Sequence, residues 1–232
     1  MLGLLLAIPF VLALVVGLLP DHQRRAAAWI AGLAPVAGLV LLALMTPDVM
    51  SGEGVRSLVP WIPAMGLDLS LRLDGLAWMF AGLVLGIGAL IVLYASYYLA
   101  AEDSMPRFLG FLLLFMGAML GMVVAGNLIL LAVFWELTSV SSFLLIGFWN
   151  HRSDAREGAR MALAITGTGG LALLGGVILL GRIAGSYELD VVLAAGPQIL
   201  ASPWYPAALG LVLLAVFTKS AQFPFQFWLP HA

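Results

Sequence analysis

The stretch that decides the fold runs from Leu128 to Trp149 and reads LILLAVFWELTSVSSFLLIGFW. It is long enough to cross a bilayer as an α-helix. Its single ionisable group is Glu136, which lies well inside the run. A carboxylate at membrane depth is costly unless it is paired, solvated or protonated, so Glu136 is a candidate functional residue.

A second deeply placed charge is Lys219, in the apolar run AALGLVLLAVFTKSAQF at 207–223. One acid and one base, each alone in its own run, predict a buried pair. At about 4 Å and an effective dielectric of about 20, such a pair interacts by roughly 4 kcal/mol. A desolvated lysine gives up its proton more readily once its carboxylate moves away, so the pair can act as a proton switch without a cofactor.

Composition places the chain in a membrane. Hydrophobic residues make up 63% of the sequence, charged residues only 9%, and the mean hydropathy is +1.10. No soluble domain needs that much apolar surface. The chain has no Cys, which excludes disulfides, thiolate metal sites and iron–sulfur ligation. We expect no cofactor and no nucleic-acid partner.

Apolar runs of spanning length predict an all-α polytopic membrane protein with about seven transmembrane helices. Uniform hydrophobicity with scattered glycines favours helices over barrel strands, which would alternate. The first run lacks the basic segment of a signal peptide, so we interpret it as a span. The segment LDLSLRLD at 67–74 does alternate and predicts a short hairpin at the membrane edge. The predicted spans lie near 2–20, 26–46, 74–98, 107–126, 128–149, 159–182 and 207–223.

The placement of arginines predicts the orientation of the chain. Loops after the first, third and fifth spans carry Arg24, Arg25, Arg107, Arg152, Arg156 and Arg160. The alternate loops carry Arg56, Arg72 and Arg182. Because cytoplasmic loops are enriched in Lys and Arg, the first set is expected inside and the N-terminus outside.

The last run is predicted to be a broken helix. Pro224 has no N–H to bond the carbonyl of Ser220, and its ring disfavours helix at Phe223, so the helix should end just after Lys219. Broken helices at membrane depth commonly mark ion sites. The alternative is that Pro224 merely ends the span at the interface. The chain reaches Ala232 without a polar tail, so we expect the sequence to continue.

Several other polar residues have a structural and a functional interpretation. Ser139, and Thr138 with Ser142, could solvate the carboxylate or bridge helices, but bonding back to their own helix is favoured. Asp74 is predicted to cap the third span. His231 follows the break at Pro224 and is a candidate relay group. The small residues of the sixth span, Thr166, Gly167, Gly169 and Gly170, predict close helix packing.

Three stretches carry a family resemblance: FWELTSVSSFLLIGFW at 134–149, KSAQFPFQFWLPHA at 219–232 and LDGLAWMF at 73–80. They resemble the antiporter-like membrane subunits, which include the large A-type subunit of Mrp-type Na⁺/H⁺ antiporters and the proton-pumping subunits of respiratory complex I. The first two stretches are most similar to the Mrp subunit. Gln226 departs from the pattern, because many Mrp subunits have His there.

The resemblance implies two inverted five-helix repeats, each with a broken helix. Residues 1–232 would form a single transmembrane region, with three N-terminal helices in 1–106 and an incomplete first repeat in 107–232. Glu136 would be the membrane glutamate and Lys219 the broken-helix lysine of a coupled pair on the proton path. The remaining helices would lie beyond Ala232.

The implied function is Na⁺/H⁺ exchange by a multi-subunit antiporter in the plasma membrane, a secondary transporter and not an enzyme. Its partners would be other membrane subunits, the lipid bilayer, protons and Na⁺. No set of Na⁺ ligands can be identified from the sequence. Two alternatives remain open: a proton-pumping subunit of a complex I or membrane-bound hydrogenase type complex, and a non-transporting scaffold. A buried ion pair adds little stability, which disfavours the scaffold.

Overall fold

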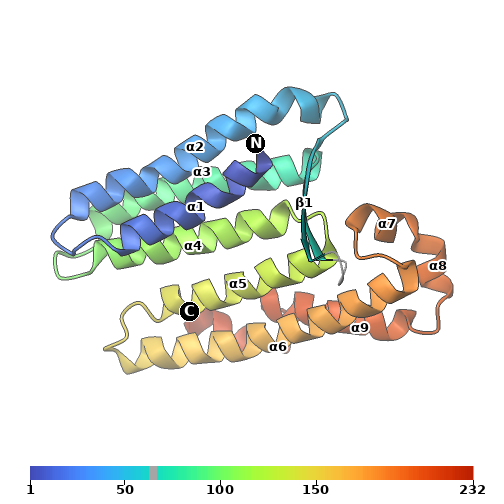
Figure 1. Cartoon of the computed structure of the whole chain (residues 1–232). Helices are drawn as coiled ribbons and strands as arrows, with labels where there is room; N and C mark the ends of the chain where they lie inside the picture. Colours follow the sequence, from blue (N-terminus) through green and yellow to red (C-terminus); the bar gives the residue numbers. More distant parts are fainter. Residues whose placement is uncertain (63–66, 232) are drawn as a thin grey trace. The chain divides into compact units, whose positions relative to one another are not determined.

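The computed structural model describes residues 1–62 and 67–231, which are mostly helical (Figure 1). The chain divides into two compact units. The first unit comprises Met1–Ser57 and Leu71–Val124, and the second comprises Leu58–Ser70 and Ala125–Ala232.

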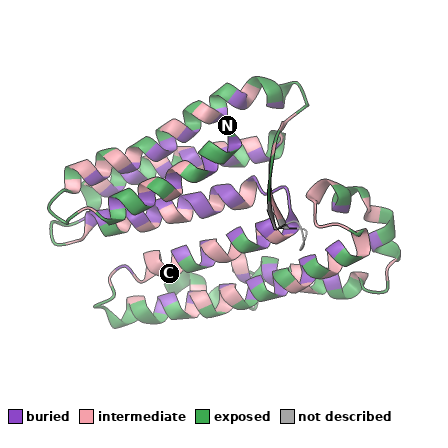
Figure 2. Ribbon diagram, in the orientation of Figure 1, coloured by how far each residue is buried: buried purple, intermediate pink, exposed green. Residues whose placement is uncertain are grey.

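The first unit is a bundle of apolar helices, α1 (Leu2–Gly17), α2 (Arg24–Met50), α3 (Gly75–Tyr98) and α4 (Met105–Val123). Helix α1 packs mainly on α4, and α2 mainly on α3. The backbones of α1 and α4 come close at Gly110, where an added Cβ would lie 3.3 Å from the Ala13 carbonyl oxygen. Helix α4 is the most buried of the bundle's long helices (Figure 2).

Asp74 caps the N-terminus of α3, as the sequence predicts. Its carboxylate accepts a 2.8 Å hydrogen bond from the Ala77 N–H and lies 2.9 Å from the Arg72 guanidinium. The cap satisfies one of the free N–H groups at the start of the helix.

The predicted hairpin is confirmed. Strands β1 (Val55–Ile62) and β2 (Leu67–Leu73) pair in a two-stranded sheet, and residues 63–66 between them lie outside the described part of the chain. The alternation of apolar and polar residues in β2 fits a strand with two different faces.

The second unit is built around α6 (Ser153–Ala184), which packs against α5 (Leu128–Ile146), α9 (Tyr205–Lys219) and the 3₁₀ helix η2 (Gln226–His231). Its apolar core includes Leu128, Leu173, Val177 and Ala215. Two short helices, α7 (Leu189–Ala194) and α8 (Gly196–Ala201), lie between α6 and α9. They are too short to span a membrane, and the apolar pattern of the sequence did not predict them.

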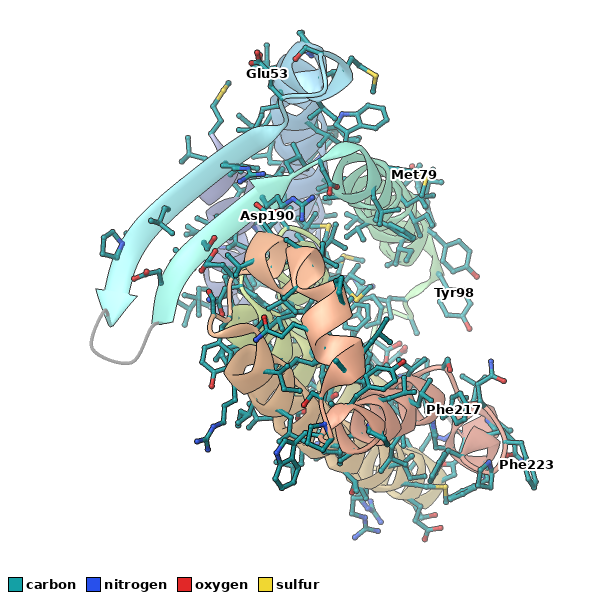
Figure 3. All side chains as sticks on the ribbon, turned by 90° about the vertical axis from the view of Figure 1, so that its right-hand side faces the viewer. Glu53, Met79, Tyr98, Asp190, Phe217 and Phe223 are labelled. Atoms are coloured by element: carbon teal, nitrogen blue, oxygen red, sulfur yellow. The ribbon has the colours of Figure 1, made fainter. Side chains whose placement is uncertain are left out.

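The predicted fold class is confirmed. In the described part of the chain, five helices are long and apolar enough to cross a membrane, and α1 and α9 are shorter apolar helices. Helix α9 ends at Lys219, and the chain continues without regular helix until Gln226. The predicted end of the helix just after Lys219 is therefore confirmed. Phe223, within the break, is 82% exposed and points outward (Figure 3).

Candidate functional site

Both deeply placed charges lie in the second unit, where α5 supplies Glu136 and α9 supplies Lys219. Helix α6 packs against both of these helices. The fold therefore brings the two predicted residues into one bundle, and each has a different immediate environment.

The Lys219 ammonium binds hydroxyl groups on α5. Nζ donates to Thr138 Oγ1 at 2.7 Å and to Ser139 Oγ at 2.9 Å. It also lies 5.6 Å from the centroid of the Trp135 ring, within the range of a cation–π contact. Thr138 and Ser139 are fully buried, so the charge is satisfied by neutral dipoles inside the bundle.

The Glu136 carboxylate packs on the backbone of α6. An added Cβ at Gly170 would overlap Glu136 Oε1, so only glycine leaves room for the carboxylate there. Oε1 is buried and has no hydrogen-bond partner among the described residues. A buried carboxylate oxygen without a hydrogen-bond partner is energetically costly.

A direct ion pair between Glu136 and Lys219 is not present among the described residues. Among the described residues no carboxylate oxygen lies within 4.0 Å of the Lys219 nitrogen. Two hydroxyls near Glu136 along α5 hold the ammonium in place of the carboxylate. Sequence spacing could identify the two charges but not the rotamers that decide which oxygen the lysine contacts.

The hydroxyls of α5 bond back to their own helix, as predicted. Thr138 Oγ1 donates to the Trp135 carbonyl at 2.7 Å, and Ser142 Oγ donates to the Ser139 carbonyl at 2.9 Å. Because each hydroxyl has one proton and two lone pairs, Thr138 and Ser139 can also accept from Lys219. Thr138 and Ser139 therefore bond back to their own helix and also link α5 to Lys219 of α9.

The end of α9 is fixed against α6 by a second glycine. An added Cβ at Gly169 would overlap Thr218 Oγ1, so this position admits the threonine of α9. The Thr218 carbonyl, left free by the end of the helix, accepts a 3.0 Å hydrogen bond from Trp228 Nε1 of η2. The predicted close packing holds at Gly169 and Gly170 but not at Gly167, where an added Cβ would meet open space.

His231 is not brought to the lysine. Its carbonyl lies against Gly158 of α6, where an added Cβ would overlap it, and the residue is exposed. Gly158 and Gly170 are twelve residues apart on α6, which corresponds to about 18 Å along the helix axis. A relay between Lys219 and His231 therefore needs intervening groups or water.

A polar cluster at the start of α5 was not identified from the sequence. Asn127 caps α5 by accepting from the Ile129 N–H at 2.9 Å, and its Nδ2 donates to Glu188 Oε1 at 2.9 Å. Ser70 Oγ donates to the other Glu188 oxygen at 2.8 Å. An asparagine directly before an apolar run is a recognised helix-start signal, so the cap was predictable. Its tertiary partners were not.

The described residues contain no group of three or more His, Asp or Glu side chains placed to hold a metal ion.

Comparison with known proteins agrees with this architecture. Residues 125–232 match the family described as NADH:quinone oxidoreductase/Mrp antiporter, transmembrane. Residues 61–109 match the family described as NADH-ubiquinone oxidoreductase (complex I), chain 5 N-terminus. These two descriptions define a class of membrane subunits common to antiporters and respiratory complexes.

Individual relatives narrow the class. The A/B subunit of a probable K⁺/H⁺ antiporter of Rhizobium meliloti is 53% identical to this chain. The match covers the whole of this chain and 23% of that subunit. It is 42% identical, over 97% of its length, to 28% of the A1 subunit of a Na⁺/H⁺ antiporter of Staphylococcus aureus. In the Mrp complex from Dietzia sp. it matches 25% of one chain, with 99% of its own length covered, a TM-score of 0.88 and 36% identity.

The chain carries regions of both families and matches the N-terminal portion of the larger A-type subunits of Mrp antiporters. It spans 23% and 28% of the length of these two curated relatives. The relatives are named as antiporter subunits, which are transporters and not enzymes.

Proposed function

We propose that this chain is part of a subunit of a multi-subunit monovalent cation/proton antiporter, and that protons move through the site formed by Glu136 and Lys219. The other partners in this proposal are further membrane subunits, the lipid bilayer, protons and Na⁺. The proposed organisation is that of the sequence analysis, with three N-terminal helices in 1–106 and an incomplete first repeat in 107–232.

The observation that carries the proposal is the different state of the two charges. The lysine is satisfied by two neutral hydroxyls, whereas Glu136 Oε1 is buried and finds no hydrogen-bond partner in the part of the chain that the structure describes. A structural pair would hold both groups together, because separating them leaves the carboxylate uncompensated. An acid and a base that are kept apart in one bundle fit the separated state of a proton switch that alternates between a formed and a broken ion pair.

In the proposed cycle the Glu136 carboxylate moves from Gly170 to the ammonium and forms the ion pair. When it returns, Thr138 and Ser139 keep the lysine in place but carry no negative charge to offset the ammonium. Lys219 then releases one proton to the next acceptor and is later reprotonated, so the proton count closes over one cycle. His231 is the proposed distant relay group, reached through water or other side chains.

Na⁺ is the proposed exchanged cation, and K⁺ is the alternative that the name of one relative raises. The same assay distinguishes them, because each cation is added separately. The family description also covers NADH:quinone oxidoreductase, so a proton-pumping redox subunit is the second candidate. Cation-dependent exchange in the absence of any electron donor separates the antiporter from the redox subunit.

The proposed location is the plasma membrane, with the N-terminus outside and residues 150–158 on the cytoplasmic side. Single cysteines at Ser153 and Ser57 are expected to react with an impermeant maleimide from opposite sides. Labelling of both from the same side would contradict this orientation.

The test of function uses inside-out vesicles that contain the complete antiporter complex. The vesicle lumen is first acidified, and Na⁺ or K⁺ is then added outside. The cation should raise the pH of the lumen, and Glu136→Ala and Lys219→Ala should each abolish this rise. Glu136→Asp should retain part of it, because the charge remains and only its reach shortens. The matched control is Glu157→Ala, which removes an exposed carboxylate of α6 and should leave exchange unchanged. Normal exchange in either alanine variant, with the complex assembled, would reject the proposal.

A further inference from the structure

A groove in the first unit has a polar end and an apolar length. Its cavity has a volume of about 950 Å³ and is lined by residues of α2, α3 and the segment before α2, and by Met105 at the start of α4. His22, Arg24 and Arg25 line one end. Trp29, Gly32 and Val36 continue it along α2, and apolar residues of α3 line it as well.

The two arginines at the polar end differ in what they bind. Arg24 is occupied, because its guanidinium donates to the carbonyls of Leu99 at 2.9 Å and Asp103 at 2.6 Å. Arg25 is exposed and makes no hydrogen bond or ion pair with any described residue. The nearby Asp21 carboxylate accepts from Ser104 and does not line the groove. The polar end therefore offers one uncommitted cation to a ligand.

The dimensions of the groove match one leaflet of a bilayer. Arg25 and Val36 are eleven residues apart on α2, which is about 16 Å along the helix. The hydrocarbon core of a bilayer is about 30 Å thick, so this length is about half of it. Trp29 and Tyr97, which line the groove, are 80% and 84% exposed. Aromatic side chains near a helix end are typical of the lipid–water interface.

We propose that this groove binds one anionic phospholipid, with its phosphate at Arg25 and an acyl chain along Gly32 and Val36. The cation recognises the headgroup charge, and basic pockets between transmembrane helices are known to bind such headgroups. A soluble anion would contact only the arginine end and would gain nothing from the apolar length of the groove. The inference stands independently of the proposed proton path.

The experiment identifies the occupant directly by photo-crosslinking. The complete complex, with Val36→benzoylphenylalanine in this chain, is reconstituted into vesicles of equal amounts of phosphatidylglycerol and phosphatidylcholine. The cross-linked species are then identified by mass spectrometry. Ile87→benzoylphenylalanine is the matched control, because Ile87 of α3 is also about half exposed but does not line the groove.

The measured quantity is the ratio of phosphatidylglycerol to phosphatidylcholine among the cross-linked lipids. This ratio should be at least about fivefold higher at Val36 than at Ile87, because one cation at a lipid surface contributes about 1 kcal/mol. Arg25→Gln should reduce the preference at Val36 to that at Ile87. Arg160→Gln, which removes an exposed arginine outside the groove, should leave it unchanged. Equal preferences at Val36 and Ile87, or an Arg25→Gln variant that keeps the preference, would overturn the headgroup site.

A second pair of variants tests the apolar length. An added Cβ at Gly32 meets open space, so Gly32→Leu should fill the groove without disturbing the helix and should abolish lipid cross-linking at Val36. Gly86→Leu, at a glycine of α3 that also faces open space but does not line the groove, should leave cross-linking unchanged. Cross-links from Val36 to a polypeptide of another subunit, in place of lipid, would reject the proposal.

Discussion

The two units of the chain solve the same packing problem with different interiors. In the described part of the first unit the fully buried side chains are apolar, such as Leu5, Leu85 and Leu113. The buried polar side chains of the described residues all belong to the second unit, and they are Asn127, Thr138, Ser139, Ser141, Thr166 and Thr218. Polar groups inside a membrane protein need partners and weaken apolar packing, so their concentration in the second unit supports the proposed proton site there.

Because the two units have different interiors, mutations in them should have different effects. Substitutions in the first unit should change stability and leave the proposed proton site at Glu136 and Lys219 unaltered. Substitutions of the groups that contact Glu136 and Lys219 in the second unit should change exchange more than stability.

The largest effect is expected from Lys219→Arg. A guanidinium keeps the charge but is effectively never deprotonated in proteins, so it cannot pass its proton on. Exchange in inside-out vesicles should fall to the level of Lys219→Ala while the complex still assembles. Exchange at near-normal rates would show that the lysine acts only through its charge, and the proton path would then run through other groups.

The next largest effect is expected from Gly170→Ala. Its new Cβ would overlap the Glu136 carboxylate, and overpacking of this kind costs about 1–3 kcal/mol. We expect exchange to fall by about tenfold or more, because the carboxylate loses its place on α6. Gly167→Ala, three residues earlier on the same helix, places its Cβ in open space and serves as the control. Equal activities of the two variants would reject the role of the glycine.

A smaller loss is expected when the hydroxyls that bind Lys219 are removed. Thr138→Val with Ser139→Ala deletes both acceptors of the ammonium, and each hydrogen bond to a charged group is worth about 1.5–3 kcal/mol. Exchange should fall severalfold and its pH profile should shift. Ser139→Thr, which retains a hydroxyl, should recover most of the Ser139→Ala loss. A purely packing role would give no change in the pH profile.

Stability tests contrast the two units at the level of single contacts. Asn127→Ala removes the cap of α5 and the donor to Glu188, so the free energy of unfolding should fall by about 1–2 kcal/mol. Trp78→Phe in the first unit removes the 3.0 Å bond from Nε1 to Thr46 and should cost about 1 kcal/mol. Thermal unfolding in detergent measures both, and exchange by the Trp78 variant should remain normal.

The smallest effect is expected at the surface pair Arg152 and Asp154. Their side chains lie 2.6 Å apart but are both exposed to solvent, where ion pairs contribute little. Asp154→Asn should change neither the unfolding temperature nor the exchange rate measurably. A clear loss would indicate that a partner buries this pair in the complex.

Much of the architecture was predictable because long apolar runs determine helices directly. The seven predicted spans correspond to five long helices and two shorter ones, and Asp74 is a cap as expected. The predicted end of the helix before Pro224 is confirmed, because proline has no N–H to donate to the preceding turn. Helices α7 and α8 were missed, since segments of six residues have no periodicity strong enough to detect.

The sequence by itself determined the class of protein, its membrane spans and the two charges at membrane depth. These follow from composition and local pattern, because hydrophobic length and an isolated ionisable residue are visible in one dimension. Only the tertiary structure decided that Lys219 binds Thr138 and Ser139, and that Glu136 rests on Gly170. Contacts between residues 34 to 81 positions apart depend on how three helices pack and on the rotamers that this packing allows, and no local pattern encodes them.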